Sequence, residues 1–242
     1  MTYLHYILTR FNVGLYNDKY WKTDKNGNRI EPESWLEERF DIFDKFCAPS
    51  IMNQTCKNFI WLVWYDIRTP EKWKAKIDSY KDIHNYRACF ARTVSRRELY
   101  SPCITESRAG KNSHLVTTRF DNDDSLHRDT VEDIQKNVEN TDLMFLNLQQ
   151  GYTYDLKEKK FYATKCKANA FITAVEALSQ AKTILGWGNH AQLKITHPTF
   201  TKELSDKRYW IQVIHDHNLM NKIKGIITTA NYLNYGMEQC SL

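Results

Sequence analysis

The feature that most constrains the fold is a seven-residue run from Phe59 to Tyr65, in which every side chain is apolar or aromatic (FIWLVWY). A strand with one face in water alternates polar and apolar residues, whereas a run without that alternation predicts a strand covered on both faces. Cover on both faces is typical of parallel sheets, because the helices that connect their strands pack on each side. The run therefore predicts a central parallel strand in an α/β sheet.

The segments around this run alternate between strand and helix patterns. Strands are predicted where apolar, β-branched and aromatic residues gather, at residues 3–13, 88–94, 115–120, 143–149 and 209–218, with a hairpin at 153–155 and 160–164. Helices are predicted from helical spacing and capping signals, at residues 34–47, 70–81 and 130–139. Ser34 and Glu37 form a capping box for the first helix. The alternation indicates a doubly wound α/β fold, and 242 residues without a Pro-, Gly- or Ser-rich linker predict a single domain, 1–242.

Charge and composition exclude several classes of protein. The net charge of +5 is mild and spread along the chain, so it says little about nucleic acid, no nucleic-acid partner is expected, and the charge fits a small anionic ligand. No stretch approaches the roughly 18 apolar residues of a membrane span and no signal peptide opens the chain, so we expect a soluble, cytoplasmic protein. The six cysteines lack C-x-x-C pairs, which argues against a zinc site or disulfide scaffold. A loose basic cluster is interpreted as a solvated loop that could instead face phosphates; its members are Arg96, Arg97, Arg108 and Lys111.

Three carboxylates, Asp121, Asp123 and Asp124, follow the predicted strand at 115–120. In open α/β sheets the carboxyl ends of the strands form the edge where ligands bind. Two aspartates separated by one residue can converge on Mg²⁺ or Mn²⁺ and leave coordination positions open for phosphate oxygens. A surface turn rich in Asp and Asn needs no metal, so that alternative stays open. The strand before the cluster and the helix predicted after it favour a metal site.

Other predicted strands also end in polar side chains. Thr9, Arg10 and Phe11 offer a hydroxyl, a guanidinium and an aromatic face to a nucleotide, although they could simply end the strand. Asp66 ends the apolar run and would either contact a base or ribose or cap the next helix. A late strand ends in His215, and histidine is a common partner of aspartate in divalent metal sites.

Taken together, these segments resemble the rhamnosyltransferase-like glycosyltransferases. The residues that carry the resemblance are His5–Phe11 (HYILTRF), Phe46–Gln54 (FCAPSIMNQ), Phe59–Pro70, Thr118–His127 (TRFDNDDSLH) with Ile134 and Gln135, and Trp210–Asn218 (WIQVIHDHN). The resemblance implies a GT-A-like, Rossmann-like fold with a mixed, mostly parallel sheet flanked by helices. It also implies a transferase that uses a nucleotide-sugar donor and acts in glycan or polysaccharide synthesis.

The resemblance further implies roles for individual residues. Asp121 and Asp123 would hold the diphosphate and a Mn²⁺ or Mg²⁺ ion, with Asp124 in support and His215 as a further metal ligand. The nucleotide site would be formed by residues at the strand ends, namely Thr9, Arg10, Phe11, Asp66 and Arg119. The acceptor would be a glycan or a lipid-linked saccharide, with peripheral membrane contact and no integral membrane segment.

The chemistry of sugar transfer explains why such groups would be needed. Cleavage of the sugar–phosphate bond leaves a nucleoside diphosphate with extra negative charge, which a divalent cation offsets. The acceptor hydroxyl must lose a proton, and an Asp or Glu can take it if the reaction inverts the anomeric centre. Glu176, in the segment Phe171 to Leu178, is the candidate base, with Asp155 and Asp216 as alternatives.

Two other functions remain as alternatives. A metal-dependent nucleotidyltransferase would also bind a nucleotide at the edge of an α/β sheet, but the sequence lacks a glycine-rich, lysine-containing phosphate loop near the N-terminus. A non-catalytic carbohydrate-binding protein would use the many aromatic residues, but that function leaves the aspartate cluster unexplained. The aspartate cluster therefore favours the transferase.

Overall fold

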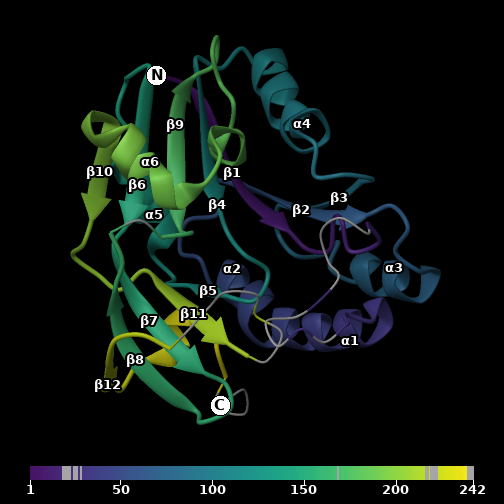
Figure 1. Ribbon diagram of the computed structural model, residues 1–242. Coiled ribbons are helices and arrows are strands. Elements are labelled where there is room, and N and C mark those ends of the chain that lie inside the picture. The colour runs from purple at the N-terminus through teal and green to yellow at the C-terminus, as the bar shows by residue number, and fades with distance from the viewer. Residues whose placement is uncertain are drawn as a thin grey trace.

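The computed structural model describes residues 1–17, 23, 27, 29–167, 169–215, 218 and 223–238, with the backbone alone at 96–98. Within these residues a seven-stranded central sheet forms the middle of the molecule (Figure 1). Its strands, in spatial order, are β10 (Thr201–Leu204), β6 (Leu143–Leu148), β9 (Ile172–Ala177), β4 (His114–Arg119), β1 (Tyr3–Arg10), β2 (Ile60–Asp66) and β3 (Tyr86–Ala91). Every neighbouring pair is parallel except the two that contain β9. The mixed, mostly parallel α/β sheet expected from the sequence is confirmed.

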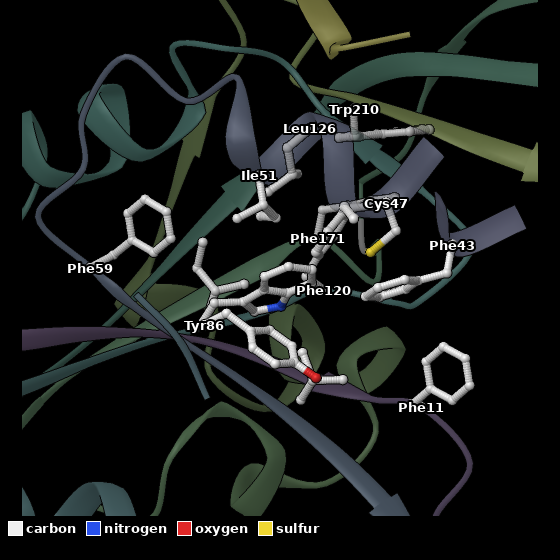
Figure 2. Close-up of a cluster of buried hydrophobic side chains, with 14 of the residues drawn as sticks. Phe11, Phe43, Cys47, Ile51, Phe59, Tyr86, Phe120, Leu126, Phe171 and Trp210 are labelled. Carbon is white, nitrogen blue, oxygen red and sulfur yellow. The ribbon is translucent and has the colours of Figure 1, made fainter. Parts of the chain in front are cut away.

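Helices cover both faces of this sheet, as the apolar run predicts. Alternate side chains of β2 enter different cores: Trp61 and Val63 lie on one face, and Leu62 and Trp64 lie on the other. The first face packs against α1 (Pro32–Ile42), η1 (Phe43–Cys47), α2 (Ala48–Met52), α3 (Glu71–Asp78) and α5 (Thr130–Lys136). The second face packs against α4 (Arg96–Ala109), η2 (Ile184–Trp187) and α6 (His190–Thr196). Figure 2 shows part of the first core, with Phe43 and other side chains drawn as sticks.

A second sheet lies beside the carboxyl ends of β1 and β4, below the central sheet in Figure 1. Its strands, in spatial order, are β12 (Ile226–Thr228), β8 (Lys160–Lys165), β7 (Gln150–Asp155), β11 (Trp210–Ile214) and β5 (Ser125–Leu126). The predicted hairpin is confirmed as β7 and β8, which pair antiparallel. The predicted late strand is β11, and it joins this second sheet. Strand β5 follows Asp124 directly and pairs with β11. The late strand β11 therefore lies beside the acidic segment Asp121–Asp124.

Several sequence-based boundaries are wrong. Helix α1 begins at Pro32 and its N-cap is Glu31, so the capping box at Ser34 does not form; the Ser34 hydroxyl donates to the Glu31 carbonyl. Residues 96–109 form the helix α4, whereas a basic loop was expected. The helical pattern was missed because the segment contains a proline and many charged residues. Helix α6 and strands β10 and β12 were not predicted. The remaining short turns are η3 (Pro198–Phe200) and η4 (Tyr232–Tyr235).

None of the described helices combines the length and apolar character needed to cross a bilayer.

Candidate functional site

A cleft of about 940 Å³ opens between the carboxyl ends of β1 and β4 and the second sheet. Five of the residues predicted for the site line it: Arg10, Phe11, Arg119, Asp121 and Asp123. The aspartates follow β4 directly, so the parallel sheet places them at the edge where α/β sheets bind ligands. The structure therefore brings the end of the first strand and the acidic segment to one cavity.

Asn122, the residue between Asp121 and Asp123, fixes the acidic segment Asp121–Asp124 in place. Asn122 donates from Nδ2 to the carbonyl oxygen of Phe11 at 2.7 Å, and its Oδ1 accepts from Arg39 at 2.9 Å. These bonds attach the segment to the end of β1 and to α1. Asp124 turns away from the cleft, and its Oδ1 accepts from the backbone N–H of Val213 in β11 at 3.0 Å. Asp124, expected to support Asp121 and Asp123 at the ligand site, thus attaches the segment Asp121–Asp124 to the second sheet through its carboxyl group.

The carboxylate of Asp123 lies among three polar side chains from distant parts of the chain. Its Oδ2 accepts from Arg39 at 2.5 Å and from Asn218 at 3.2 Å, and it lies 3.1 Å from His215 Nε2. Burial raises the pKa of Asp123, but the positive charge of Arg39 and the contact with His215 outweigh burial and hold the pKa well below its usual range. Asp123 is therefore ionised at neutral pH. Burial and the charges of Asp123 and Asp121 raise the pKa of Asp124 instead.

The arrangement of Asp123 and His215 fits two ligands of one divalent ion. Neighbouring ligands of an octahedral ion with bonds of about 2.1 Å are about 3.0 Å apart, and the carboxylate oxygen and imidazole nitrogen here are 3.1 Å apart. Among the described residues, no three His, Cys, Asp or Glu side chains converge as a metal site. Asp121, the third predicted ligand, is held by Arg119 instead. His217 and Asp216 lie outside the described residues.

Arg119 links the first aspartate of the motif to a histidine that the sequence did not indicate. Its Nη2 donates to both carboxylate oxygens of Asp121, at 3.1 and 3.0 Å. Its Nη1 lies 2.6 Å from Nδ1 of His190, at the start of α6. Because a guanidinium group only donates, Nδ1 must accept, and the neutral ring carries its proton on Nε2. Burial, reinforced by the charge of Arg119, lowers the pKa of His190 to about 4, so the ring is neutral at pH 7 and adds no charge to the cleft.

Two stacked aromatic rings are among the side chains that line the cleft. The rings of Phe171 and Trp210 lie 4.8 Å apart with an angle of 7° between their planes. The indole N–H of Trp210 donates to the Leu148 carbonyl at 2.7 Å, which fixes the ring at the junction of the two sheets. A Cβ atom at Gly151 would overlap the Trp210 ring, so glycine is required at that position of β7.

The model of the putative rhamnosyl transferase family matches residues 6–226. The chain belongs to this family. A search of curated proteins finds no match. The resemblance stated from the sequence is therefore confirmed at the level of the family.

Several solved structures are also similar to the chain at low sequence identity. S. aureus TarS residues 1–349 in complex with UDP is 10% identical, with a TM-score of 0.45, over 87% of this chain and 60% of that chain. A putative nucleotide-diphospho-sugar transferase from Desulfovibrio desulfuricans G20 is 9% identical, with a TM-score of 0.41, over 89% of this chain and 83% of that chain. HddC from Yersinia pseudotuberculosis complexed with GMP-PN is 9% identical, with a TM-score of 0.36, over 88% of this chain and 93% of that chain. The chain thus spans about three fifths of the TarS fragment.

Two predicted nucleotide-binding residues lie outside the cleft lining of this family member. Thr9 is fully buried, and its hydroxyl accepts from the indole N–H of Trp61 at 2.9 Å. Asp66 is also fully buried, and its carboxylate accepts from the backbone N–H of Gly14 at 3.2 Å and from Arg68 at 2.8 Å. Both side chains therefore join strand ends and loops to one another, which corrects their expected contact with a nucleotide.

Glu176 lies at the opposite end of the central sheet from the acidic segment. Because β9 is antiparallel to β4, Glu176 pairs with Leu115, four residues before Arg119 at the end of β4. At about 3.3 Å per residue, this separation is about 13 Å along the strand. Glu176 accepts hydrogen bonds from the backbone N–H of Lys182 at 2.7 Å and from Trp187 Nε1 at 2.8 Å. Its predicted role as catalytic base is therefore corrected, because the side chain does not reach the cleft.

The alternative bases do not replace Glu176. The carboxylate of Asp155 accepts from the backbone N–H groups of Lys157 and Glu158, at 3.0 and 3.1 Å, and so shapes the turn between β7 and β8. Asp216 lies outside the described residues. Asp121 and Asp123 are the carboxylates that line the described part of the cleft.

Arg39 is the functional residue that sequence reasoning missed although a signal was present. It lies on the buried face of α1 together with Leu36 and Phe40, at the spacing of one helical stripe. An arginine is seldom buried without an anionic partner, so its place on an apolar face points to a buried carboxylate elsewhere. No comparable signal marks His190, which follows a turn and begins a short helix.

Proposed function

We propose that the chain transfers a sugar from a nucleoside diphosphate donor to a hydroxyl group of a glycan or lipid-linked saccharide. The observation that carries the proposal is the ionised Asp123, held by Arg39, His215 and Asn218 at the carboxyl edge of the parallel strands inside a cleft. Family membership supports sugar transfer, and the family's description makes rhamnose the first sugar to test.

The donor's diphosphate would bind where positive groups line the cleft at the ends of β1 and β4. Arg10 and Arg119 lie at these strand ends, and both line the cleft. Guanidinium groups suit phosphate oxygens because they donate two parallel hydrogen bonds. Phe11 lines the cleft beside Arg10. The volume of about 940 Å³ lies near the upper end of about 300–1,000 Å³ for ligand pockets, so a donor and part of an acceptor fit together.

Asp123 and His215 are the residues that would hold a Mn²⁺ or Mg²⁺ ion. Such an ion would offset the negative charge that develops on the leaving diphosphate. Arg39 contributes by holding Asp123 in its ionised form, which metal binding requires. Asn218 contributes by orienting His215, because its Oδ1 accepts from the His215 backbone N–H at 2.7 Å.

Donor binding tests this proposal directly. UDP-, GDP- and dTDP-sugars are screened by calorimetry with Mn²⁺, Mg²⁺ or a chelator, and released nucleotide products are identified. For the donor that binds, Asp123→Asn should weaken metal-dependent binding about 10- to 100-fold, as loss of a metal-site partner does. Glu176→Gln makes the same acid-to-amide change outside the cleft and should leave donor affinity unchanged.

The outcomes separate the transferase from its alternatives. Release of a nucleoside diphosphate supports sugar transfer, whereas release of pyrophosphate would identify a nucleotidyltransferase. His215→Gln provides a second variant if Asp123→Asn is unstable, and it should lower the affinity for Mn²⁺ in the same direction. Absence of nucleotide binding by the parent protein, or equal donor affinity in both site variants and the parent, would overturn the proposal.

A further inference from the structure

Three lysines on and beside the second sheet form one wall of the cleft, here called the lysine wall. Lys165 ends β8, Lys167 follows two residues later, and Lys224 lies just before β12. All three side chains are exposed, and all three line the cleft. This wall belongs to the second sheet, whereas Arg10, Arg119 and the aspartates belong to the edge of the central sheet.

The backbone of this wall is fixed, so the position of the lysines is built into the fold. The hydroxyl of Thr164 donates to the carbonyl oxygen of Lys224 at 3.0 Å. Gly225 adopts a φ of +103°, and a Cβ there would overlap the Ala163 carbonyl, so the chain can approach β8 only because this residue is glycine. On the other side, Asn147 Nδ2 donates to the Lys167 carbonyl at 3.1 Å. The three ammonium groups therefore extend from anchored backbone.

The lysine wall has no acidic partner among the described residues. Lys160, on the same strand, pairs with Glu158, and Lys207 pairs with Asp129 and Asp133. No described carboxylate lies within ion-pair distance of Lys165, Lys167 or Lys224; the ion pairs of the described chain involve other lysines. Clustered like charges repel one another, so a fixed group of unpaired lysines favours an anionic ligand.

The charge balance of the cleft leaves these lysines for a second anion. Arg39 is matched by Asp123, and Arg119 is matched by Asp121. Arg10 and the three lysines remain without a matching carboxylate among the described lining residues. A donor diphosphate at the strand ends would contact Arg10 and Arg119, and the three lysines on and beside the second sheet would remain for another anion.

We infer that the lysine wall binds an anionic group, a carboxylate or a phosphate, carried by the acceptor saccharide. The inference rests on the proposed sugar transfer and adds the chemical class of its acceptor. The anion would lie against Lys165, Lys167 and Lys224, and the reacting hydroxyl would point toward the donor at the aspartate edge. The wall would thus select charged acceptor saccharides over neutral ones.

Defined tetrasaccharides test this selection. Tetragalacturonic acid carries carboxylates, a phosphorylated maltotetraose carries phosphate, and maltotetraose is neutral; all three are titrated calorimetrically into the full chain at low and moderate salt. We expect at least one charged tetrasaccharide to bind about tenfold or more tightly than maltotetraose, because charged hydrogen bonds add affinity. The charged probe that binds better identifies carboxylate or phosphate as the preferred group.

Matched charge variants assign the effect to this wall. Replacing Lys165, Lys167 and Lys224 together by alanine should abolish the preference for the charged probe, and donor affinity should stay unchanged. Replacing Lys74, Lys81 and Lys136 together by alanine removes the same total charge from residues that do not line the cleft, and the preference should survive. Circular dichroism confirms that both variants are folded.

Three results would overturn the inference. Equal binding of charged and neutral tetrasaccharides, including no binding of either, would show that the wall does not select anions. An equal loss in both triple variants would show a general charge effect. A loss of nucleotide affinity in the cleft variant would assign the lysines to the donor. If no nucleotide binds but the lysine-dependent preference persists, sugar transfer fails as the function while the anion site stands.

Discussion

The two ends of the central sheet each bury a carboxylate, and the two carboxylates have opposite environments. Asp123, at the carboxyl edge, contacts Arg39, His215 and Asn218, which lie 84, 92 and 95 residues away in the chain. Glu176, at the other end, contacts Lys182 and Trp187, which lie six and 11 residues away. Burial alone therefore does not distinguish the two carboxylates; their partners and the adjoining cavity do.

The difference extends to the charge that each carboxyl group carries. At Asp123 the charge of Arg39 overcomes burial and lowers the pKa, whereas at Glu176 burial dominates and raises the pKa. Asp123 is thus built to remain ionised in a buried position, as binding of a cation or a cationic partner requires. Glu176 accepts two hydrogen bonds that a neutral group could also accept.

Removal of the cation beside Asp123 should cause the largest change in stability. Arg39→Met keeps an apolar stem on α1 but leaves the Asp123 carboxylate buried without its ion pair. Breaking one side of a buried pair costs about 3–5 kcal/mol, so we expect the free energy of unfolding to fall by about that amount. Urea unfolding at pH 7 measures the change.

A double variant separates the ion pair from general packing. Combining Arg39→Met with Asp123→Asn removes both charges, so the double variant should be more stable than Arg39→Met alone. If the second substitution restores nothing, Arg39 stabilises the fold by packing against Trp35, which it contacts at 4.8 Å from the ring centroid, rather than by neutralising Asp123.

His5 of β1 is a buried ionisable residue that lies in the central sheet between the ends that hold Asp123 and Glu176. Its Nδ1 accepts from Gln135 Nε2 at 3.2 Å, and its Nε2 lies 2.8 Å from the Thr118 hydroxyl. Burial lowers the pKa of His5 to about 3. The unfolded chain takes up this proton near pH 6.5, so the contribution of His5 to stability is complete above that pH and is lost as the pH falls toward 3.

The pH dependence of stability should therefore change when His5 is replaced. At about pH 4.5, the parent protein should lose about 2.5 kcal/mol through His5 relative to pH 7. The His5→Gln variant has no imidazole to protonate. The decrease in its free energy of unfolding between the two pH values should therefore be smaller than that of the parent protein by about this amount. Urea unfolding at both pH values measures the difference, and equal losses in the two proteins would contradict the buried neutral histidine.

Local patterns in the sequence predicted the parts of the site that depend on one segment. The apolar run 59–65 predicted a strand buried on both faces, and β2 divides its side chains between two cores. The Asp-Asn-Asp sequence after the 115–120 strand predicted an acidic strand end, and Asp121 and Asp123 line the cleft. Both predictions use only the residues of one strand and the turn that follows it, which is why they succeed.

Predictions failed where the direction of a strand or a distant partner decides the outcome. Glu176 lies near the carboxyl end of β9, as Arg119 lies at the carboxyl end of β4, but β9 runs antiparallel to β4 and so carries Glu176 to the other end of the sheet. Nothing in the local sequence fixes that direction. Arg39 contacts Asp123, and His190 contacts Arg119, from segments far along the chain, so only the tertiary fold brings these residues together.

The smallest effect is expected at Glu176, where an acid-to-amide change should be harmless. Burial raises the pKa of Glu176, so the folded protein binds this proton more tightly than the unfolded chain does. The resulting stability is present at low pH and is lost as the pH rises through the pKa of the folded state. At pH 7 the buried carboxylate thus opposes folding, whereas the oxygen of a glutamine can accept from both Lys182 N–H and Trp187 Nε1. Glu176→Gln should therefore change the free energy of unfolding at pH 7 by less than about 1 kcal/mol, or raise it. Thermal unfolding at pH 7 and in mild acid measures it; a loss of several kcal/mol at pH 7 would show that the charge itself is needed at this end of the sheet and would remove the contrast with Asp123.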